Sequence, residues 1–502
     1  MIEGSLWNSY SDETITYPKL KGDIAVDVAI VGGGITGIST AQALAERGYK
    51  VAVLEAKSVG KGTTSHSTGN LYVIIDQLLS SLKSKYDKEV VKKVILSRWD
   101  ALKKIEQNVE AFQIDCDFKK QPLFLFEDAN SMKMLEEKKV AKEIEFEFFE
   151  LTKTFPLDHD DGMRIEDQAQ FNPLLYIQGL ASAIEGENCK IYEQTIVRAI
   201  EEEEDRVLVH TPGAIVSAQY AIHATHTPKG MEMQYHTALG PYREYGIAAK
   251  LHSPDYPEGI FWGYYHDKKY SLRSYSRKGE QYLIAVGSPH KMGQAKDNKE
   301  HVEDLKNFIQ KRFDISEFTH VWGGQNYKPA DLLPYIGRKK TNSREFVATG
   351  FSTDGLVYGT LSALILADQI EGKFNPYEEL YRAARHNPAK SAGKFIKENV
   401  NVAGEFIKDL VFKGDDEDLV GIPPGEAAVL TRNGEKLAVY KKEDGSLSIL
   451  SALCTHMACR VHWNNVEKSW DCPCHGSRFN TTGEVIEGPA YIPLNKIEID
   501  NK

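Results

Sequence analysis

The chain begins with the polarity pattern of an α/β domain. Residues 24–31 (IAVDVAIV) form an almost continuous apolar run rich in β-branched side chains, which is typical of a buried parallel strand. Apolar residues then recur three positions apart at Ile35, Ile38 and Ala41, as on one face of a helix, and residues 49–54 predict a second strand. A strand, a helix and a strand in this order predict a doubly wound domain with a parallel sheet.

The pattern changes in the middle of the chain, where strand-forming residues dominate. Residues 245–251, 259–265 and 282–286 are apolar and aromatic runs separated by polar turns, and they predict successive strands of a second sheet. A long apolar segment then predicts a helix over residues 361–370.

The last hundred residues predict a separate small domain. Residues 391–412 carry apolar side chains at near-helical spacing among Lys and Glu, which predicts an amphipathic helix within a linker over 373–418. After the linker, short strands alternate with turns, and they are expected at 426–431, 436–441 and 447–450. A small all-β domain is therefore predicted over 419–502.

A glycine motif at the first strand–helix junction indicates a dinucleotide site. Gly32, Gly34 and Gly37 fit the pattern G-x-G-x-x-G, and Glu55 ends the second strand 21 residues after Gly34. The first two glycines permit a tight turn and close approach of a pyrophosphate, the third permits close helix–strand packing, and the helix N-terminus attracts phosphates. An acidic residue at Glu55 suits ribose hydroxyls and argues against NADP, whose 2′-phosphate it would repel.

Four further segments decide between NAD and FAD. They are the polar loop 60–69 (GKGTTSHSTG), the strand end 221–226, the segment 322–337 (WGG…DLLPYIG) and the glycine-flanked turn 350–355. With them, residues 25–372 resemble the D-amino-acid oxidase-like family of flavoenzymes. The resemblance implies FAD, and residues that would contact it are Thr63, Thr64, Ser65, His66, Val197, Ala224, Gly350, Gly355 and Leu356.

The same resemblance implies a division of the first module, residues 1–372. FAD-binding parts are expected at about 24–80, 150–230 and 320–372, and an inserted antiparallel-sheet substrate domain at about 81–149 and 231–319. Relatives bind a substrate carboxylate on this sheet through Arg and Tyr, and the candidates here are Arg243, Arg273, Tyr264 and His290. Some relatives attach FAD covalently through a histidine near the position of His66, but we expect a non-covalent contact.

Cysteines and histidines near the end of the chain indicate a metal centre. Cys454 and His456, followed after 15 residues by Cys472 and His475, give C-x-H and C-x-x-H. The spacing resembles a Rieske [2Fe–2S] domain, whose two thiolates hold one iron and whose two imidazoles hold the other, nearer the surface. Neutral ligands raise the potential to about −150 to +300 mV. A Cys₂His₂ zinc site is the alternative, but it leaves the flanking residues unexplained.

The flanking residues resemble one Rieske subfamily, that of cytochrome bc-type complexes. Cys459 and Cys474 match its disulfide, and Ser477 matches a hydroxyl that donates to a cluster sulfur. The subfamily's tyrosine two positions later is Phe479 here, so we expect a lower potential than in those complexes.

Composition excludes several other functions. The chain has 502 residues, 41% of them hydrophobic, and a net charge of −11, with no basic stripe that would indicate nucleic-acid binding. No signal peptide and no membrane-spanning stretch are visible, so the expected location is the cytoplasm, where a disulfide would need shielding.

These features together predict an FAD-dependent oxidoreductase with a second redox centre. The expected substrate is a small amine or amino acid, oxidised at its C–N bond, and the expected route is from FAD through the cluster to an external electron acceptor. Reverse flow into the flavin and a non-catalytic redox sensor are the alternatives. A Rieske oxygenase is not expected, because the flavin-like module and the 27 residues after His475 leave no room for its iron domain.

Overall fold

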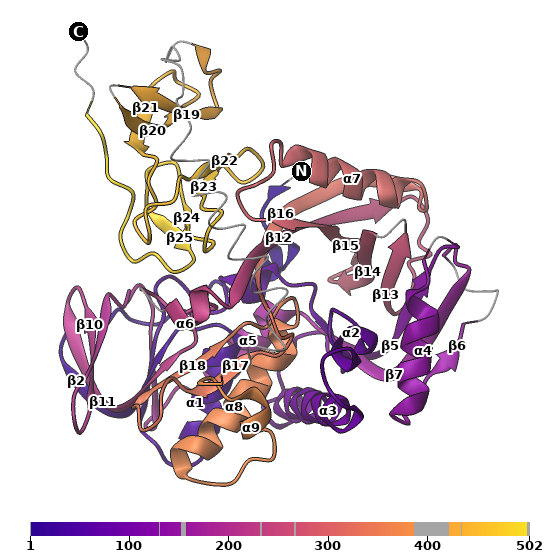
Figure 1. Cartoon of the computed structure of the whole chain (residues 1–502), viewed down its shortest axis with the longest axis horizontal. Coiled ribbons are helices and arrows are strands. Elements are labelled where there is room, and N and C mark those ends of the chain that lie inside the picture. Colours follow the sequence, from indigo (N-terminus) through magenta and orange to yellow (C-terminus); the bar gives the residue numbers. More distant parts are fainter. Residues whose placement is uncertain are drawn as a thin grey trace.

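The computed structural model describes residues 2–129, 131–151, 157–230, 233–265, 268–385, 421–432 and 434–498 (Figure 1). The predicted linker helix over 391–412 lies outside these residues. The described part of the chain contains two large sheets and two small ones, and the chain passes repeatedly between the large sheets.

One large sheet has eight strands and is built on the predicted strand–helix–strand unit. Its path is β17-β18-β11-β2-β3-β8, and the central pairs of β2 with β3 and β11 are parallel, as expected for strands buried on both faces. A hairpin, β9 and β10, extends β11. The bounds are β2 Ile24–Val31, β3 Val51–Leu54, β8 Cys189–Tyr192, β9 Ala199–Glu202, β10 Val207–Thr211, β11 Ala214–His223, β17 Tyr335–Arg338 and β18 Glu345–Thr349.

Helices cover this sheet because their apolar residues need burial. The helix α1 (Ile35–Ala45) is buried along almost its whole length and packs against α8 (Gly355–Glu371) and α5 (Pro173–Ile184). Asn172 caps α5 by accepting from two backbone N–H groups, and Pro173 begins it. Other helices are α2 Leu79–Lys83, α3 Lys88–Ala111, α4 Lys133–Glu143, α6 Met233–His236, α7 Lys299–Gln310 and α9 Glu378–Tyr381.

The second large sheet has ten strands, in the order β1-β16-β12-β15-β14-β13-β5-β7-β4 with β6 beside β7. It is antiparallel except where β13 pairs with β5 and β1 pairs with β16. The bounds are β1 Ile2–Glu3, β4 Asn70–Leu71, β5 Lys119–Glu127, β6 Phe149–Glu150, β7 Asp161–Gln170, β12 Leu239–Leu251, β13 Ile260–Tyr265, β14 Lys268–Arg277, β15 Glu280–Lys291 and β16 Ile315–Pro329.

The sheet differs from its sequence prediction in two respects. Only three of its strands, β12, β13 and β15, were predicted; β14, for example, was not, because polar residues interrupt its apolar positions. The expected division placed residues 150–230 with the FAD-binding part, whereas β7 pairs along its length with β5 of the ten-stranded sheet. Strand β16 joins the same sheet through β12, so the two parts interlock more than a division by sequence suggests.

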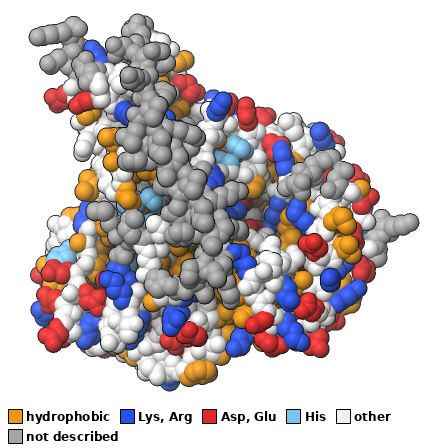
Figure 2. Space-filling view, viewed as in Figure 1, with side chains coloured by type: hydrophobic (Ala, Val, Ile, Leu, Met, Phe, Trp, Pro, Cys, Tyr) orange, Lys and Arg blue, Asp and Glu red, His pale blue; other side chains and the backbone are white. Residues whose placement is uncertain are grey.

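The C-terminal domain is all β, as predicted. It holds a three-stranded sheet (β19 Ala427–Arg432, β20 Glu435–Lys441, β21 Leu447–Ser451) and a four-stranded sheet (β22 His462–Asn464, β23 Ser469–Asp471, β24 Arg478–Phe479, β25 Val485–Glu487). Its core contains Trp470 and Phe479, both fully buried. Figure 1 shows β22–β25 above α6 and beside β12 and β16. On the face drawn in Figure 2, acidic and basic side chains are interspersed.

Candidate active site and metal centre

One cavity of about 620 Å³ runs between the two large sheets and under the C-terminal domain. Its lining comes from the turn after β2, the loop 60–68, the ends of β11 and α8, and the strands β12, β13, β14 and β16. Residues 485–491 of the C-terminal domain complete the wall. The cavity therefore belongs to both modules.

The glycines at the first strand–helix turn form a cradle that side chains would fill. Gly32 has φ of +112°, and a Cβ on it would lie 2.4 Å from the carbonyl oxygen of Ala224. A Cβ on Gly37 would lie 1.8 Å from the carbonyl oxygen of Gly32. Because no side chain stands at these glycines, the N-terminus of α1 opens onto the cavity. A helix N-terminus exposed in this way is a suitable site for a pyrophosphate.

The structure brings most of the predicted FAD contacts to this cavity. Gly32, Gly34, Glu55, Thr63, Thr64, His66, Val197, Ala224, Gly355 and Leu356 line it. Gly37, Ser65 and Gly350 do not line it: Gly37 packs against Gly32, and the Ser65 hydroxyl donates to the carbonyl of Gly62 at 3.0 Å. Gly350 has φ of +78°, which turns the chain from β18 towards α8.

Hydrogen bonds hold the acidic residue and the loop in place. The Glu55 carboxylate accepts from the backbone N–H of Gly33 at 2.7 Å and of Lys57 at 2.8 Å. The Thr64 hydroxyl oxygen accepts from Ile35 N–H, at the first turn of α1, at 3.1 Å. Nδ1 of His66 lies 2.8 Å from the carbonyl oxygen of Gly62, so that ring edge is already engaged. That His66 contacts FAD without a covalent bond stays a prediction.

The four predicted cluster ligands lie on two loops of the C-terminal domain. Cys454 and Cys472 are free thiols that share a hydrogen bond, which lowers the pKa of Cys454. Burial lowers the pKa of His456 to about 4 and that of His475 to about 3, so both imidazoles are neutral at pH 7. Both Nδ1 atoms are buried and accept no hydrogen bond from the described residues. Two thiols and two orphaned nitrogens fit a Rieske cluster.

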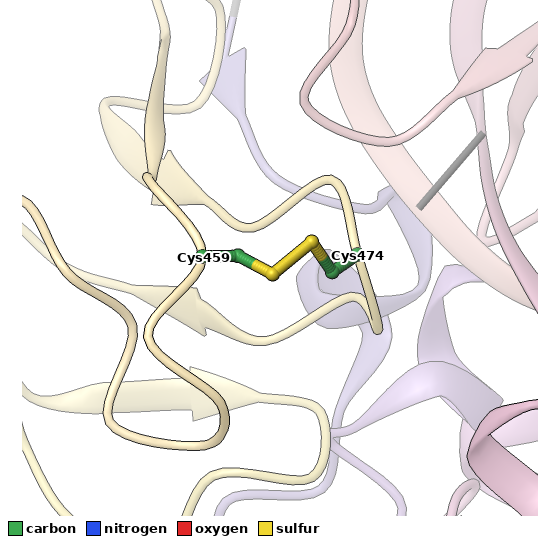
Figure 3. Close-up of a disulfide and its surroundings, with 2 residues drawn as sticks. All are labelled: Cys459 and Cys474. Carbon is green, nitrogen blue, oxygen red and sulfur yellow. A yellow bond between two sulfur atoms is a disulfide. The ribbon is translucent and has the colours of Figure 1, made fainter. Parts of the chain in front are cut away.

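A disulfide joins the two ligand loops. Cys459 and Cys474 are bonded and nearly fully buried, which shields the bond from solvent (Figure 3). The sulfurs of Cys459, Cys472 and Cys474 all lie within 4.8 Å of one another, but the disulfide removes two of them as metal ligands. Ser477 lies where its hydroxyl hydrogen-bonds Cys454, and it also accepts from Ala490 N–H at 3.2 Å.

The imidazoles are the more exposed pair of predicted ligands, as expected, since Cys454 is 2% and Cys472 1% exposed, but their edge meets the first module and not solvent. His456 is 9% exposed and His475 is 5% exposed. The ring of His236, on α6 of the first module, lies 4.6 Å from that of His456 and 5.7 Å from that of His475. Nε2 of His456 lies 3.1 Å from the carbonyl oxygen of Gly230. The C-terminal domain therefore docks by the edge that carries its imidazoles.

Strand β16 connects the docking face to the cavity. The Gln325 amide donates to the carbonyl of Gly476 at 2.8 Å, and the Tyr327 hydroxyl donates to the carbonyl of His475 at 3.2 Å. Gln325 also lines the cavity, together with its neighbour Gly324. One strand thus contacts both sites.

Buried charges hold the docked domain. Arg243, 1% exposed on β12, donates two hydrogen bonds to the Glu467 carboxylate in the turn between β22 and β23. Arg478 lies 3.2 Å from Glu467 and 3.0 Å from Asp471. Burial raises the pKa of Glu467, but the two guanidinium groups outweigh it and lower that pKa to about 2.

None of the four substrate-site candidates lines the cavity. Arg243 is engaged by Glu467, as described above. Arg273 donates to the carbonyls of Thr68 at 3.0 Å and Gly69 at 2.9 Å, so it fixes the end of the loop 60–69 and does not face the cavity. His290 stacks on His301 with ring centroids 3.9 Å apart. Tyr264 is 5% exposed, on β13, under the Lys133 ammonium.

Two groups of cavity residues were missed by sequence reasoning. The first is a wall of Tyr72, Asp76, Glu244, Trp262 and Lys269, which we call the chamber wall. The second is the closing segment, residues 485–491, in which Glu487 accepts from the Thr63 hydroxyl at 2.9 Å and lies 3.1 Å from Nδ1 of His226. No local motif marks either group; each depends on which strands and domains meet.

This combination of a two-sheet dinucleotide cavity and a Cys₂His₂ loop pair defines a flavoenzyme with a Rieske domain. The chain belongs to the FAD dependent oxidoreductase family, whose model matches residues 27–369. A Rieske [2Fe-2S] domain matches residues 414–498. The first module binds FAD, the second binds a [2Fe–2S] cluster, and the protein is an oxidoreductase.

Relatives share the whole architecture or one half of it. A Bacillus subtilis (strain 168) protein, YhfW, whose name describes a Rieske 2Fe-2S iron-sulfur protein, is 32% identical over 98% of this chain and 97% of its own. Gamma-glutamylputrescine oxidoreductase of Escherichia coli (strain K12) is 24% identical over 73% of this chain and 89% of its own. The cytochrome b6-f complex iron-sulfur subunit of Chlorobaculum thiosulfatiphilum is 39% identical over 17% of this chain and 48% of its own.

Solved structures share the fold of the first module. Glycine oxidase from Geobacillus kaustophilus superposes with a TM-score of 0.60 at 21% identity, covering 72% of this chain and 99% of that one. L-proline dehydrogenase from P. horikoshii gives 0.58 at 18% identity, over 73% and 98%. Among the described residues, no helix has the length and apolarity needed to cross a membrane.

Proposed function

We propose that this protein oxidises the C–N bond of a small amine or amino acid and passes the electrons through the Rieske cluster to an external acceptor. The substrate loses two electrons and two protons to become an imine, which water hydrolyses to an amine and a carbonyl compound. FAD, when bound, accepts two electrons, and the cluster carries one electron at a time.

The observation that carries the proposal is the docking of the imidazole edge onto the flavin module. His456 and His475 face His236, and the backbone carbonyls beside the cluster ligands accept from Gln325 and Tyr327 of β16. Because Gln325 also lines the cavity, a single strand separates the two sites. A Rieske domain acting only as a structural appendage would have no need of this orientation.

The relatives support the substrate class. The names of gamma-glutamylputrescine oxidoreductase and glycine oxidase describe proteins that oxidise an amine and an amino acid. For this chain, an electron outlet through the cluster favours a dehydrogenase over an enzyme that passes electrons to oxygen. The reverse direction, from cluster to substrate, uses the same geometry and is decided by the experiment below.

Replacing one thiolate tests the route. Cys472→Ser is expected to abolish the cluster while the flavin still bleaches when substrate is added without oxygen. Turnover with cytochrome c as one-electron acceptor is expected to fall at least about 100-fold, because the outlet is lost. Undiminished turnover without the cluster would contradict the route, and a flavin that no amine or amino acid bleaches would contradict the oxidation itself.

A further inference from the structure

The charges that face the cavity bear on what kind of amine can bind. Arg478 is the one arginine among the described residues that line it, and Glu467, Asp471 and Glu487 surround its guanidinium. The lining lysines are likewise engaged: Lys57 by the carbonyl of Ile486, Lys61 by Glu13, Lys229 by the carbonyl of Gly488, and Lys269 by Asp76. Lys57 and Lys229 are thus held at the closing segment, and the one described lining cation of the chamber wall, Lys269, is already paired with a carboxylate.

Of the five described acidic residues that line the cavity, four have a partner and one has none. Glu55 accepts from backbone N–H groups, Asp76 pairs with Lys269, Glu467 pairs with Arg243, and Glu487 accepts from Thr63. Among the described residues that line the cavity, Glu244 is the one acidic residue whose carboxyl group has no hydrogen bond and no ion pair within 4 Å. It lies on β12 directly across from Gly324 of β16. Burial raises the pKa of Glu244, and the nearby Lys328 and Lys269 ammonium groups oppose that shift without pairing with it. An unpaired carboxyl group thus stands on the chamber wall.

The rest of the chamber wall suits an aliphatic chain. Tyr72 and Trp262 meet edge to face with ring centroids 4.4 Å apart, and both rings are almost fully buried. The Lys269 ammonium lies 3.6 Å from the Trp262 ring centroid, which fixes it against the wall beside Asp76. Aromatic surface next to an unpaired carboxylate is the chemistry that recognises an alkyl chain ending in an ammonium group.

We propose that the substrate is an amine whose far end carries a second positive charge, as in an N-alkylated diamine, and that Glu244 binds this charge. The proposal rests on the proposed C–N oxidation and names its substrate class. A far-end carboxylate is disfavoured, because it would meet Glu244 as a like charge and the Lys269 ammonium of the same wall is already paired with Asp76. Glu244 is a binding residue that distinguishes substrates by charge.

Three probes with the same reactive group test this. N-methyl-1,4-diaminobutane, N-methylbutylamine and N-methyl-4-aminobutanoate share a CH₃–NH–CH₂ group and end in an ammonium, a methyl and a carboxylate. In anaerobic flavin bleaching, the half-saturating concentration is expected to be lowest for the diamine and highest for the carboxylate. Glu244→Gln should raise the diamine value about 10–100-fold, the loss of one charge-assisted bond, and leave N-methylbutylamine within about twofold.

The control variant is Glu258→Gln, which makes the same change at an exposed residue paired with Lys119 away from the cavity, and it should alter none of the three values. The proposal is overturned if the carboxylate probe has the lowest half-saturating concentration, or if Glu244→Gln changes the values of all three probes equally. In either case the proposed C–N oxidation still stands. If no amine or amino acid bleaches the flavin, the proposed function fails instead. In that case, binding of 1,4-diaminobutane and of 4-aminobutanoate is measured through the absorbance of the oxidised flavin. Binding of the diamine that Glu244→Gln weakens supports the role of Glu244. Tighter binding of 4-aminobutanoate than of the diamine refutes it.

Discussion

The two cofactor sites are built from the chain in opposite ways. All four predicted cluster ligands lie between residues 454 and 475, on two loops of one small domain that a disulfide joins. The cavity for FAD is lined by residues from Val31 to Tyr491, and its last wall belongs to the Rieske domain. The predicted cluster ligands therefore all come from the Rieske domain, whereas the lining of the flavin site includes residues of both domains.

This asymmetry has a consequence for the enzyme. A site complete within one small domain can assemble early and independently. A site closed by a second domain couples cofactor retention to docking, so a change at the interface should reach FAD before it reaches the cluster.

The largest effect is expected at the turn that only the flavin site uses. In Gly37→Ala the new Cβ would lie 1.8 Å from the carbonyl oxygen of Gly32, and neither backbone segment can move without breaking the strand–helix junction. We expect the flavin module to lose at least about 3 kcal/mol of unfolding free energy and to be purified without FAD. The reduced-cluster electron-resonance signal should persist.

The control for that change is Gly213→Ala. Its nearest neighbour would be the Leu20 carbonyl oxygen at 3.9 Å, so FAD content and stability should be unchanged. Loss of both cofactors in Gly37→Ala, measured as flavin absorbance and acid-labile sulfide, would mean that the cluster site depends on the flavin module after all.

An intermediate effect is expected at the interface. Glu467→Gln leaves Arg243, 1% exposed, without its counter-charge, and removing one partner of a buried pair costs about 3–5 kcal/mol. We expect FAD to dissociate faster, measured by its recovered fluorescence, while the cluster signal remains. Glu435→Gln, at the exposed first residue of β20, is the matched control. An unchanged FAD release rate in Glu467→Gln would refute the coupling.

Acid should weaken the same interface. The pKa of Glu467 falls from an ordinary 4.5 to about 2 in the folded protein, so its contribution is fully present above pH 4.5 and is lost as pH falls towards 2. The shift corresponds to ~3 kcal/mol. The acid dependence of FAD release between pH 4.5 and 2 should be shallower in Glu467→Gln than in the wild type.

The smallest effect is expected inside the cluster domain. Phe479 is fully buried two positions after Ser477, and Phe479→Tyr would add a hydroxyl donor to the cluster's surroundings. One hydrogen bond of about 1 kcal/mol corresponds to a rise of about 40 mV in the midpoint potential of a one-electron couple. Redox titration followed by electron resonance measures it, and FAD content should not change. A potential that stays constant or falls would show that the added hydroxyl does not reach the cluster.

The same asymmetry explains what the sequence could predict. The cluster ligands and the FAD glycines follow from short motifs, because chemistry fixes their spacing within one turn or loop. Arg243 and Arg273 were misplaced because a suitable residue type on a strand does not reveal its partner, and both partners come from distant segments. Glu244 and the closing segment could not be predicted, since only the pairing of β12 with β16 and the docking of a second domain bring them to the cavity.

The burial of the imidazole edge was also beyond sequence reasoning. A Rieske motif specifies which atoms bind iron but not what covers them. Here α6 and β16 of the flavin module supply the cover through His236 and Tyr327. In the proposed route, electrons enter the cluster through this covered edge.

Anaerobic stopped-flow absorbance tests the central claim, that electrons pass from FAD through the docked cluster. After mixing with an amine substrate, the flavin band should bleach first and the cluster bands should follow, and a one-electron acceptor added next should reoxidise the cluster before the flavin. A cluster that stays oxidised while the acceptor reoxidises reduced FAD at the full turnover rate would contradict the claim.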